Sequence, residues 1–206
     1  MVSSALTNFE ERRKDIDRIL QAHGYFVRFY RAENRLRTAG HGLDRLAAAI
    51  RELGASPRPG RPPNLEALNR AAIVLLSAHL EGYIEDVYSE AATVLLEGKV
   101  KNLEVLVKNA QDSFQNPRPR AIEQLFGTIG LPGILDGISW RRANNDSVRR
   151  RLGEFLTLRN DVAHGDETNV HKSKVQYYSR FTKLFAENMD RKVGDEVASS
   201  TSTPHW

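Results

Sequence analysis

The sequence predicts an all-α protein: a single-domain bundle of long antiparallel helices, with one shorter helix that carries the candidate functional residues. Apolar residues recur at spacings of three or four through most of the chain, which is typical of helices with one buried face. Strand-like alternation is not evident, and glycines and prolines separate the periodic stretches. The 206 residues suffice for one domain with its own core. We expect this domain to span residues 1–194, followed by a disordered tail, 195–206, rich in Ser and Thr.

The composition narrows the possible function classes. The chain has no cysteine, which excludes disulfides, thiolate metal sites and a cysteine nucleophile. Its six histidines are scattered singly and no His-Glu-x-x-His motif occurs, so we predict neither a metal site nor a cofactor. Because no apolar run approaches the roughly 20 residues that span a bilayer, and no signal peptide is visible, we expect a cytoplasmic protein without a membrane partner. The net charge of +4 permits a phosphate-rich partner.

The first half of the chain contains three predicted helices. Residues 6–37 form the first, and residues 42–53 the second, which ends at a glycine. Residues 54–63 contain four prolines and are predicted to be an exposed loop within the domain. Asn64 is a suitable N-cap for a third helix that extends to about residue 97, near 50 Å at ~1.5 Å per residue. We expect this long apolar helix to be the spine of the domain. The apolar positions predicted for the first helix are Phe9, Ile16, Ile19, Leu20, Phe26 and Phe29.

The second half begins with two short predicted helices, at about 99–112 and 118–129. The glycines that follow lack the lysine and the strand of a P-loop, so nucleotide binding is not predicted. Trp140 is expected to anchor this glycine-rich loop to the core. A helix beginning near Asp146 carries the candidate motif, and a last helix is predicted over about 171–192.

The helix that begins near Asp146 places an arginine within its apolar stripe. At roughly 100° per residue, Arg159 falls among the apolar positions rather than opposite them. Arginine is rarely buried unless it is paired, so this position requires a carboxylate, a phosphate or a water-filled gap. His164 and Gly165 are typical of a helix end, with a cation in the last turn and a residue that accepts positive φ. The apolar stripe is formed by Val148, Leu152, Phe155 and Val162.

Arg159 and His164 form an Arg-x4-His pair that resembles the motif of the HEPN superfamily, whose ribonucleases carry Arg-x4-6-His at the end of a late helix. Two earlier pairs, Arg18 with His23 and Arg35 with His41, have similar spacing. Context favours the third pair, because a polar Asn160 follows the arginine, glycine follows the histidine, and the pair lies late in the chain. Residues 75–86 are in addition similar to the central helix of the RiboL-PSP-associated HEPN group.

The resemblance implies a metal-independent endoribonuclease that acts as a homodimer and leaves 2′,3′-cyclic phosphate ends. It also implies a biological role as the toxin of a toxin–antitoxin pair, with a possible cognate antitoxin protein, or as an antiviral defence effector. The residues fit this chemistry. RNA supplies its own nucleophile, the ribose 2′-hydroxyl; His164 could act as acid or base and Arg159 as a phosphate clamp.

Spacing suggests how the site is assembled. Five residues apart on an ideal helix, Arg159 and His164 differ in direction by roughly 140°, so one phosphate can meet both only if the helix unwinds or a second chain contributes. The homodimer that the HEPN resemblance implies would supply the second chain, and on that ground we expect a symmetric dimer with the two motif helices facing each other. Asn160 would line the catalytic site. Glu81, and secondarily Glu85, would pair with Arg159; both could instead face solvent.

Five arginines near the motif helix form the densest basic cluster: Arg141, Arg142, Arg149, Arg150 and Arg151. They could contact an RNA backbone, or they could form an ordinary solvated face. Arg159 could likewise bridge helices through a core ion pair, with His164 as a plain helix cap. Two alternatives to the nuclease therefore remain: a non-catalytic helical module that dimerises or binds RNA, and a partner-binding helical domain with no nucleic-acid role.

Overall fold

The computed structural model describes residues 2–38, 65–166 and 168–202, and these ranges are all-α, as predicted. The predicted helix at 42–53 and the loop at 54–63 lie outside them. The helices are α1 (Ser4–Thr38), α3 (Leu65–Leu96), α4 (Leu103–Ser113), α5 (Pro119–Gly127), α6 (Asn145–Ala163) and α7 (Lys172–Thr201). None of these helices is both long and apolar enough to cross a membrane.

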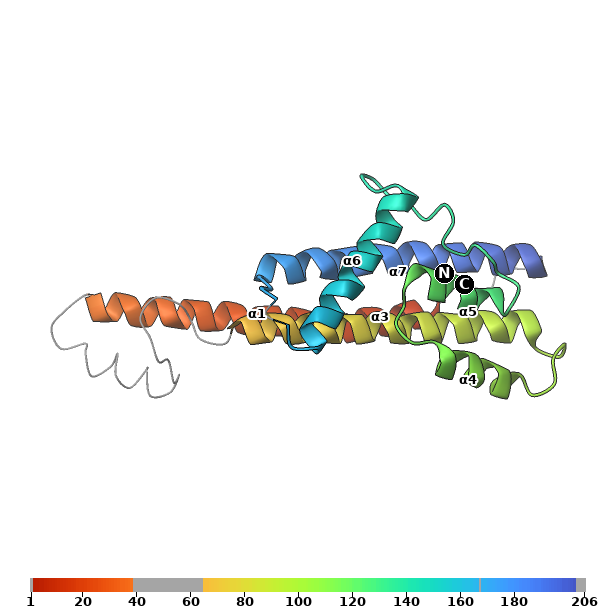
Figure 1. The fold of residues 1–206 in the computed structure, drawn as a ribbon, viewed down its shortest axis with the longest axis horizontal. Coiled ribbons are helices and arrows are strands. Elements are labelled where there is room, and N and C mark those ends of the chain that lie inside the picture. Colours follow the sequence, from red (N-terminus) through yellow and green to blue (C-terminus); the bar gives the residue numbers. More distant parts are fainter. Residues whose placement is uncertain (1, 39–64, 167, 203–206) are drawn as a thin grey trace.

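Three long helices, α1, α3 and α7, lie side by side and form the body of the molecule (Figure 1). Helices α3 and α7 run in the same direction, and α1 runs antiparallel to both. Helix α6 crosses the bundle obliquely, while α4 and α5 lie beside the C-terminal half of α3. This arrangement brings the C-terminal end of α6 over the N-terminal half of α3.

Helix α3 is the spine of the domain, as its apolar sequence predicts. It contacts α1, α4, α5, α6 and α7, and thirteen of its residues are buried. Tyr83 illustrates why it can be buried on several sides: its ring lies 5.3 Å from that of Phe9, and its hydroxyl donates to the Ala186 carbonyl at 2.9 Å. A buried tyrosine needs such a partner for its hydroxyl. Tyr83 therefore ties α1 and α7 to the same turn of α3.

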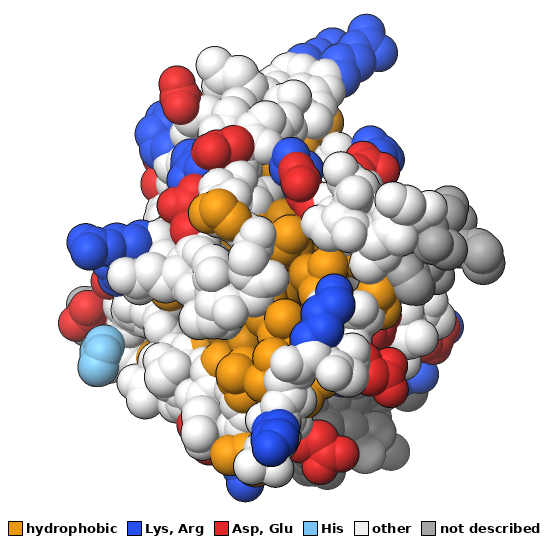
Figure 2. Space-filling model, turned by 90° about the vertical axis from the view of Figure 1, so that its right-hand side faces the viewer, with side chains coloured by type: hydrophobic (Ala, Val, Ile, Leu, Met, Phe, Trp, Pro, Cys, Tyr) orange, Lys and Arg blue, Asp and Glu red, His pale blue; other side chains and the backbone are white. Residues whose placement is uncertain are grey.

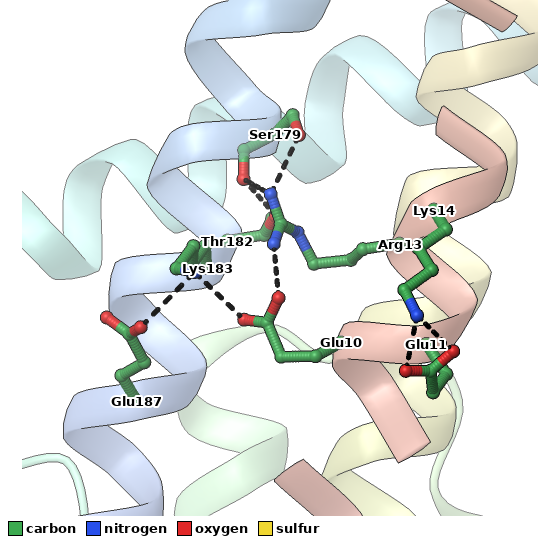
Figure 3. A network of polar contacts seen from close by, with 8 residues as sticks. All are labelled: Glu10, Glu11, Arg13, Lys14, Ser179, Thr182, Lys183 and Glu187. Atoms are coloured by element: carbon green, nitrogen blue, oxygen red, sulfur yellow. Dashed lines mark hydrogen bonds and ion pairs between the residues drawn. The ribbon is translucent and has the colours of Figure 1, made fainter. Parts of the chain in front are cut away.

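A polar network joins α1 to α7 (Figure 3). Arg13 Nη1 donates to Glu10 Oε2 at 2.8 Å, and Arg13 Nη2 donates to the Ser179 carbonyl and hydroxyl at 3.2 and 3.1 Å. Lys183 lies 3.6 Å from carboxylate oxygens of both Glu10 and Glu187. The cations in this network are therefore balanced within the molecule.

Two carboxylates hold the beginning of α1. The Ser3 hydroxyl caps the helix by accepting from the Leu6 amide at 2.9 Å, and it donates to Asp190 of α7. Glu90 of α3 accepts from the Ala5 amide at 2.7 Å. Carboxylates are favourable at this position because the first amides of a helix lack partners and carry partial positive charge. Burial raises the pKa of Asp190, and the hydrogen bonds from Ser3 only partly oppose that shift.

The raised pKa of Asp190 predicts a pH-dependent difference between wild type and Asp190→Asn. A folded carboxyl with a raised pKa binds its proton more tightly than the unfolded chain does, so its favourable contribution is complete below the unfolded pKa of about 3.8 and declines as pH rises through the folded value. The stability of Asp190→Asn relative to wild type should therefore rise from pH 3.5 to neutrality. Urea unfolding across this range measures the difference. A constant or falling difference would contradict the assignment.

Two sequence-based expectations about α1 and α7 are wrong. Residues 195–201 are not a disordered tail, because α7 continues to Thr201 and Val197 is fully buried. Val193 and Val197 extend the buried stripe of α7 by one turn each, and this packing outweighs the Ser and Thr content of the last turns. Phe26, a predicted position of the apolar face of α1, is 54% exposed. The side chain of Phe29 lies outside the described residues.

Candidate active site

Helix α6 positions the motif residues, and its ends agree with the sequence prediction. The Asn144 side chain caps the helix by accepting from the Ser147 amide at 3.0 Å. His164 is the C-cap, and Gly165 follows with φ 83°, a left-handed conformation that favours glycine. Between these ends the buried residues of α6 are Val148, Leu152, Phe155, Leu156 and Leu158. This apolar stripe packs α6 against the bundle, and the packing orients Arg159 toward α3.

The Arg159 guanidinium is held by three side chains. Its Nε donates to Ser77 Oγ at 3.3 Å, its Nη1 donates to Asn160 Oδ1 at 3.1 Å, and its Nη2 lies 3.7 Å from Glu81 Oε2. The side chains of Arg159 and Glu81 are 23% and 26% exposed. The ion pair expected between Glu81 and Arg159 is thus present. Because the guanidinium has five N–H donors and still reaches solvent, it could also bind an anion.

Glu81 is itself fixed by a loop that sequence reasoning did not associate with the site. Its Oε1 accepts from the backbone amide of Asn116 at 3.1 Å. Asn116 precedes Pro117 and has φ 68°, a left-handed conformation that asparagine tolerates better than most residues. The two oxygens of Glu81 are therefore shared between this loop and Arg159. The only sequence signal for Asn116 was its place in the Asn-Pro pair that separates two helices.

Glu85, the second carboxylate proposed to support Arg159, is not brought to it. Among the described residues its carboxylate has no hydrogen-bond or ion-pair partner. Its backbone carbonyl accepts from Gln111 Nε2 of α4 at 3.0 Å. Burial raises the pKa of Glu85, and the neighbouring charges of Glu81 and Asp86 raise it further. Glu85 contributes negative charge near Glu81 rather than a contact with Arg159.

The side chains of His164 and Arg159 have different environments. It is exposed at the end of α6, its backbone amide donates to the Asn160 carbonyl at 2.9 Å, and within the described ranges its side chain has no partner. Arg159 is directed into the α3 contact, whereas His164 is available to solvent. Asn160 lies between them and accepts from Arg159.

The five arginines of the basic cluster have different environments. Arg149 donates to Glu123 and to Asp136, at 2.5 and 2.7 Å, and the hydrogen bond to Glu123 is the main cause of its raised pKa. Arg150 lies 3.6 Å from Glu154. Arg141 and Arg142 are exposed in a turn closed by Trp140 and Ala143, and Arg151 is half-buried. The charge of Arg149 is therefore balanced within the molecule, and Arg141, Arg142 and Arg151 are the better candidates for RNA contact.

The loop before α6, which carries Arg141 and Arg142, is anchored through Trp140 as the sequence predicted. The Trp140 ring lies 5.9 Å from Phe181 of α7. Within the described part of the chain, no three His, Asp or Glu side chains are grouped as metal ligands would be. The groups that the site offers are a held guanidinium, an exposed imidazole, a hydroxyl, an amide and one carboxylate.

Comparison with protein families shows what part of the chain is similar to known proteins. The family described as RiboL-PSP-HEPN matches residues 90–195, just over half of the 206-residue chain. The matched range contains α4, α5, α6 and most of α7, and therefore both Arg159 and His164. Glu81 and Ser77 lie outside it. Neither curated proteins nor solved structures gave a match.

Proposed function

The chain belongs to the RiboL-PSP-HEPN family, and from this membership we propose that it is a metal-independent endoribonuclease. The observation that carries the proposal is the Arg159–His164 pair at the end of α6, inside the matched range, with Arg159 already held by α3. Family membership by itself supports a nuclease-type or RNA-binding module. The assignment of cleavage to these residues is our inference.

The proposed reaction uses the RNA 2′-hydroxyl as the nucleophile. Its oxygen attacks the adjacent phosphorus while a base removes its proton, and the bond to the 5′-oxygen breaks as an acid supplies a proton to that oxygen. His164 would act in one of these two roles, because imidazole exchanges protons near neutral pH. Arg159 would stabilise the charge that develops on the phosphate oxygens. The products would be a 2′,3′-cyclic phosphate and a 5′-hydroxyl.

A second copy of the chain would complete the site. Directions on an ideal helix place Gly153, Thr157, Asn160 and His164 within about 40° of one line along α6. These side chains are small or polar, and a Cβ added at Gly153 would meet nothing within 4 Å. A glycine in a helix interior costs about 1 kcal/mol relative to alanine, and close approach of another helix would account for it. We propose that α6 packs against α6 of the partner subunit along this line.

The dimer is tested by substitution of Gly153. Gly153→Trp should weaken association by about tenfold or more, since overpacking a close contact costs about 1–3 kcal/mol. Gly127→Trp is the matched control, because Gly127 is also a helical glycine that faces open space, in α5. Sedimentation equilibrium measures both. Equal association of the two variants would argue against an interface at α6.

The function is tested by incubating purified protein with total RNA in excess EDTA, beside a His164→Ala variant. We expect cleavage by the wild type only, with cyclic phosphate on the new 3′ ends. Circular dichroism and sedimentation would verify that both proteins are folded and have the same oligomeric state. Absence of cleavage by either protein would refute the nuclease proposal. EDTA-sensitive cleavage would refute its metal independence.

One observation favours a different function for the same site. Arg159 is already engaged by Glu81, Ser77 and Asn160, as an arginine that only bridges α6 and α3 would be. In that case the chain would be a non-catalytic module that dimerises or binds RNA. The two functions differ in the EDTA assay, because this module would bind RNA without cutting it.

The biological role that we propose is that of a toxin in a toxin–antitoxin pair, or of an antiviral effector. RNA cleavage inside a cell would stop growth, so a cognate antitoxin protein is an expected partner. Induced expression of wild type in a bacterial host should arrest growth, whereas His164→Ala should not. Growth arrest by both proteins would show that toxicity does not depend on His164, and this result would contradict the proposed role.

A further inference from the structure

The outer part of α1 extends beyond the rest of the bundle. Near this point Lys172 of α7 contacts α1, and its Nζ donates to the Leu20 carbonyl at 3.0 Å. Beyond it, α1 passes the first turns of α3 and α7 (Figure 1). We call residues 20–31 of α1 the arm. Tyr25 and Phe26 on the arm are 57% and 54% exposed. Two neighbouring large aromatics exposed on one projecting helix indicate an interaction site.

Positive charge is concentrated in the arm and in the neighbouring start of α7. Residues 20–31 and 168–176 contain four cations, Arg28, Arg31, Lys172 and Lys174, and no Asp or Glu. The whole chain has a net charge of +4, so these four cations equal its entire net charge. Among the described residues, Arg28, Arg31, Lys172 and Lys174 form no ion pair. This separation of charge favours a polyanion over an ordinary protein surface as the partner.

A hollow of about 470 Å³ lies where the arm meets the start of α7. Residues that line it include Leu20, His23, Gly24, Val27, Arg28 and Lys172. The buried Nδ1 of His23 makes no hydrogen bond within the described part of the chain. Burial, and then the charge of Lys172, lower the pKa of His23. The hollow thus places two cations, Arg28 and Lys172, beside the His23 imidazole, and two cations side by side are suited to a phosphate.

The aromatic side chains are arranged among these cations. The Arg28 guanidinium lies 4.9 Å from the centroid of the Tyr25 ring, and the Tyr25 hydroxyl accepts from Gln21 Nε2 at 3.1 Å. These contacts hold the Tyr25 ring in place while more than half of it stays exposed. Aromatic rings with adjacent arginines are the usual platform for unpaired bases, because every base has a face that can stack.

We propose that the arm binds single-stranded RNA, with bases stacked on Tyr25 and Phe26 and phosphates bound by Arg28, Arg31 and Lys172. Unpaired RNA is the fitting ligand, because bases in a duplex have their faces covered by their neighbours. Eight residues separate His164 from Lys172, and the C-terminal end of α6 and the start of α7 lie toward the same end of the bundle (Figure 1), so we extend the proposal to a strand that runs from the arm toward His164. This last part of the inference rests on the proposed function, whereas binding by the arm does not require cleavage.

The test measures binding separately from cleavage. A labelled oligouridylate is titrated with His164→Ala protein, and fluorescence anisotropy gives Kd at several salt concentrations. Adding Tyr25→Ala and Phe26→Ala should weaken binding about tenfold or more, the loss expected for stacked bases. Adding Arg28→Gln and Arg31→Gln should reduce the salt slope by about 0.7 for each phosphate that is no longer neutralised.

The matched control replaces an exposed apolar residue and a cation on α4, Val105→Ala with Lys108→Gln. Its affinity should equal that of the parent protein. Unchanged affinity in both arm variants would overturn the proposal. So would equal binding of a duplex, or a change in oligomeric state of the aromatic variant with unchanged RNA affinity, since a second copy would then cover the rings.

The same proteins separate this inference from the proposed nuclease. If wild type does not cleave RNA but the arm variants lose binding, the arm is supported and the nuclease is refuted. If wild type cleaves RNA and the arm variants bind it normally, the nuclease is supported and the arm is refuted.

Discussion

Replacing Arg159 with alanine is expected to lower the rate of RNA cleavage by about 10²–10³-fold, the usual loss when one group that stabilises transition-state charge is removed. The fold should survive, because the Arg159–Glu81 pair is partly exposed and such pairs contribute about 1 kcal/mol or less. Arg159→Lys should restore little activity, since lysine keeps the charge but lacks the planar fork that contacts Ser77, Asn160 and phosphate together. Single-turnover cleavage of a defined RNA measures all three proteins.

Glu81→Gln should lower the same rate by a smaller factor, because it weakens the hold on the guanidinium without removing it. Glu85→Gln is the comparison one helical turn away, and it should have less effect because Glu85 does not contact Arg159. In the Arg159→Ala background, Glu81→Gln should have almost no further effect, since residues that act as a unit are not additive. Full activity of Arg159→Ala would mean that the Arg159–Glu81 ion pair only connects α3 and α6 and has no role in cleavage.

Replacing Phe155 with alanine is expected to destabilise the protein by about 3–5 kcal/mol, a large part of the stability of a domain of this size. Phe155 is fully buried on α6, and its ring lies 5.0 Å from that of Tyr178 on α7. Its removal would leave a cavity beneath the helix that carries Arg159 and His164. Denaturant unfolding followed by circular dichroism measures the change.

Tyr177→Ala is the matched control for this prediction. Tyr177 is 45% exposed, and its ring lies 5.0 Å from that of its neighbour in the sequence, Tyr178. Its removal should change stability by less than about 1 kcal/mol, because little apolar surface is removed from the core. A destabilisation below about 1 kcal/mol for Phe155→Ala would mean that Phe155 does not hold α6 against the bundle.

The control substitutions lie at one end of the bundle. Figure 2 faces this end, where α3 and α7 terminate and α4 and α5 lie, and shows apolar side chains between charged ones. The arm and the start of α7 lie at the opposite end. The control substitutions at Val105 and Lys108 therefore probe a surface well separated from the proposed RNA path.

Local periodicity in the sequence determined which helices form and which of their faces are buried. The apolar spacing of α3 predicts its burial, and His164 with Gly165 predicts the C-terminal end of α6. The place of Arg159 in an apolar stripe predicts that it needs a carboxylate, a phosphate or a water-filled gap, and the structure supplies a carboxylate. These features depend on neighbours within one or two helical turns, so they can be read along the chain.

Contacts between distant segments were decided only by the tertiary structure. Three contacts join residues whose sequence positions give no sign of their proximity. The Asn116 amide donates to Glu81, the Ser3 amide donates to Asp190, and Arg149 pairs with two carboxylates. Tertiary structure also decided the length of α7, which continues through the buried Val197, and the exposure of Phe26, which lies at a predicted apolar position of α1. Periodicity defines an apolar face, but only packing determines whether another helix lies against it.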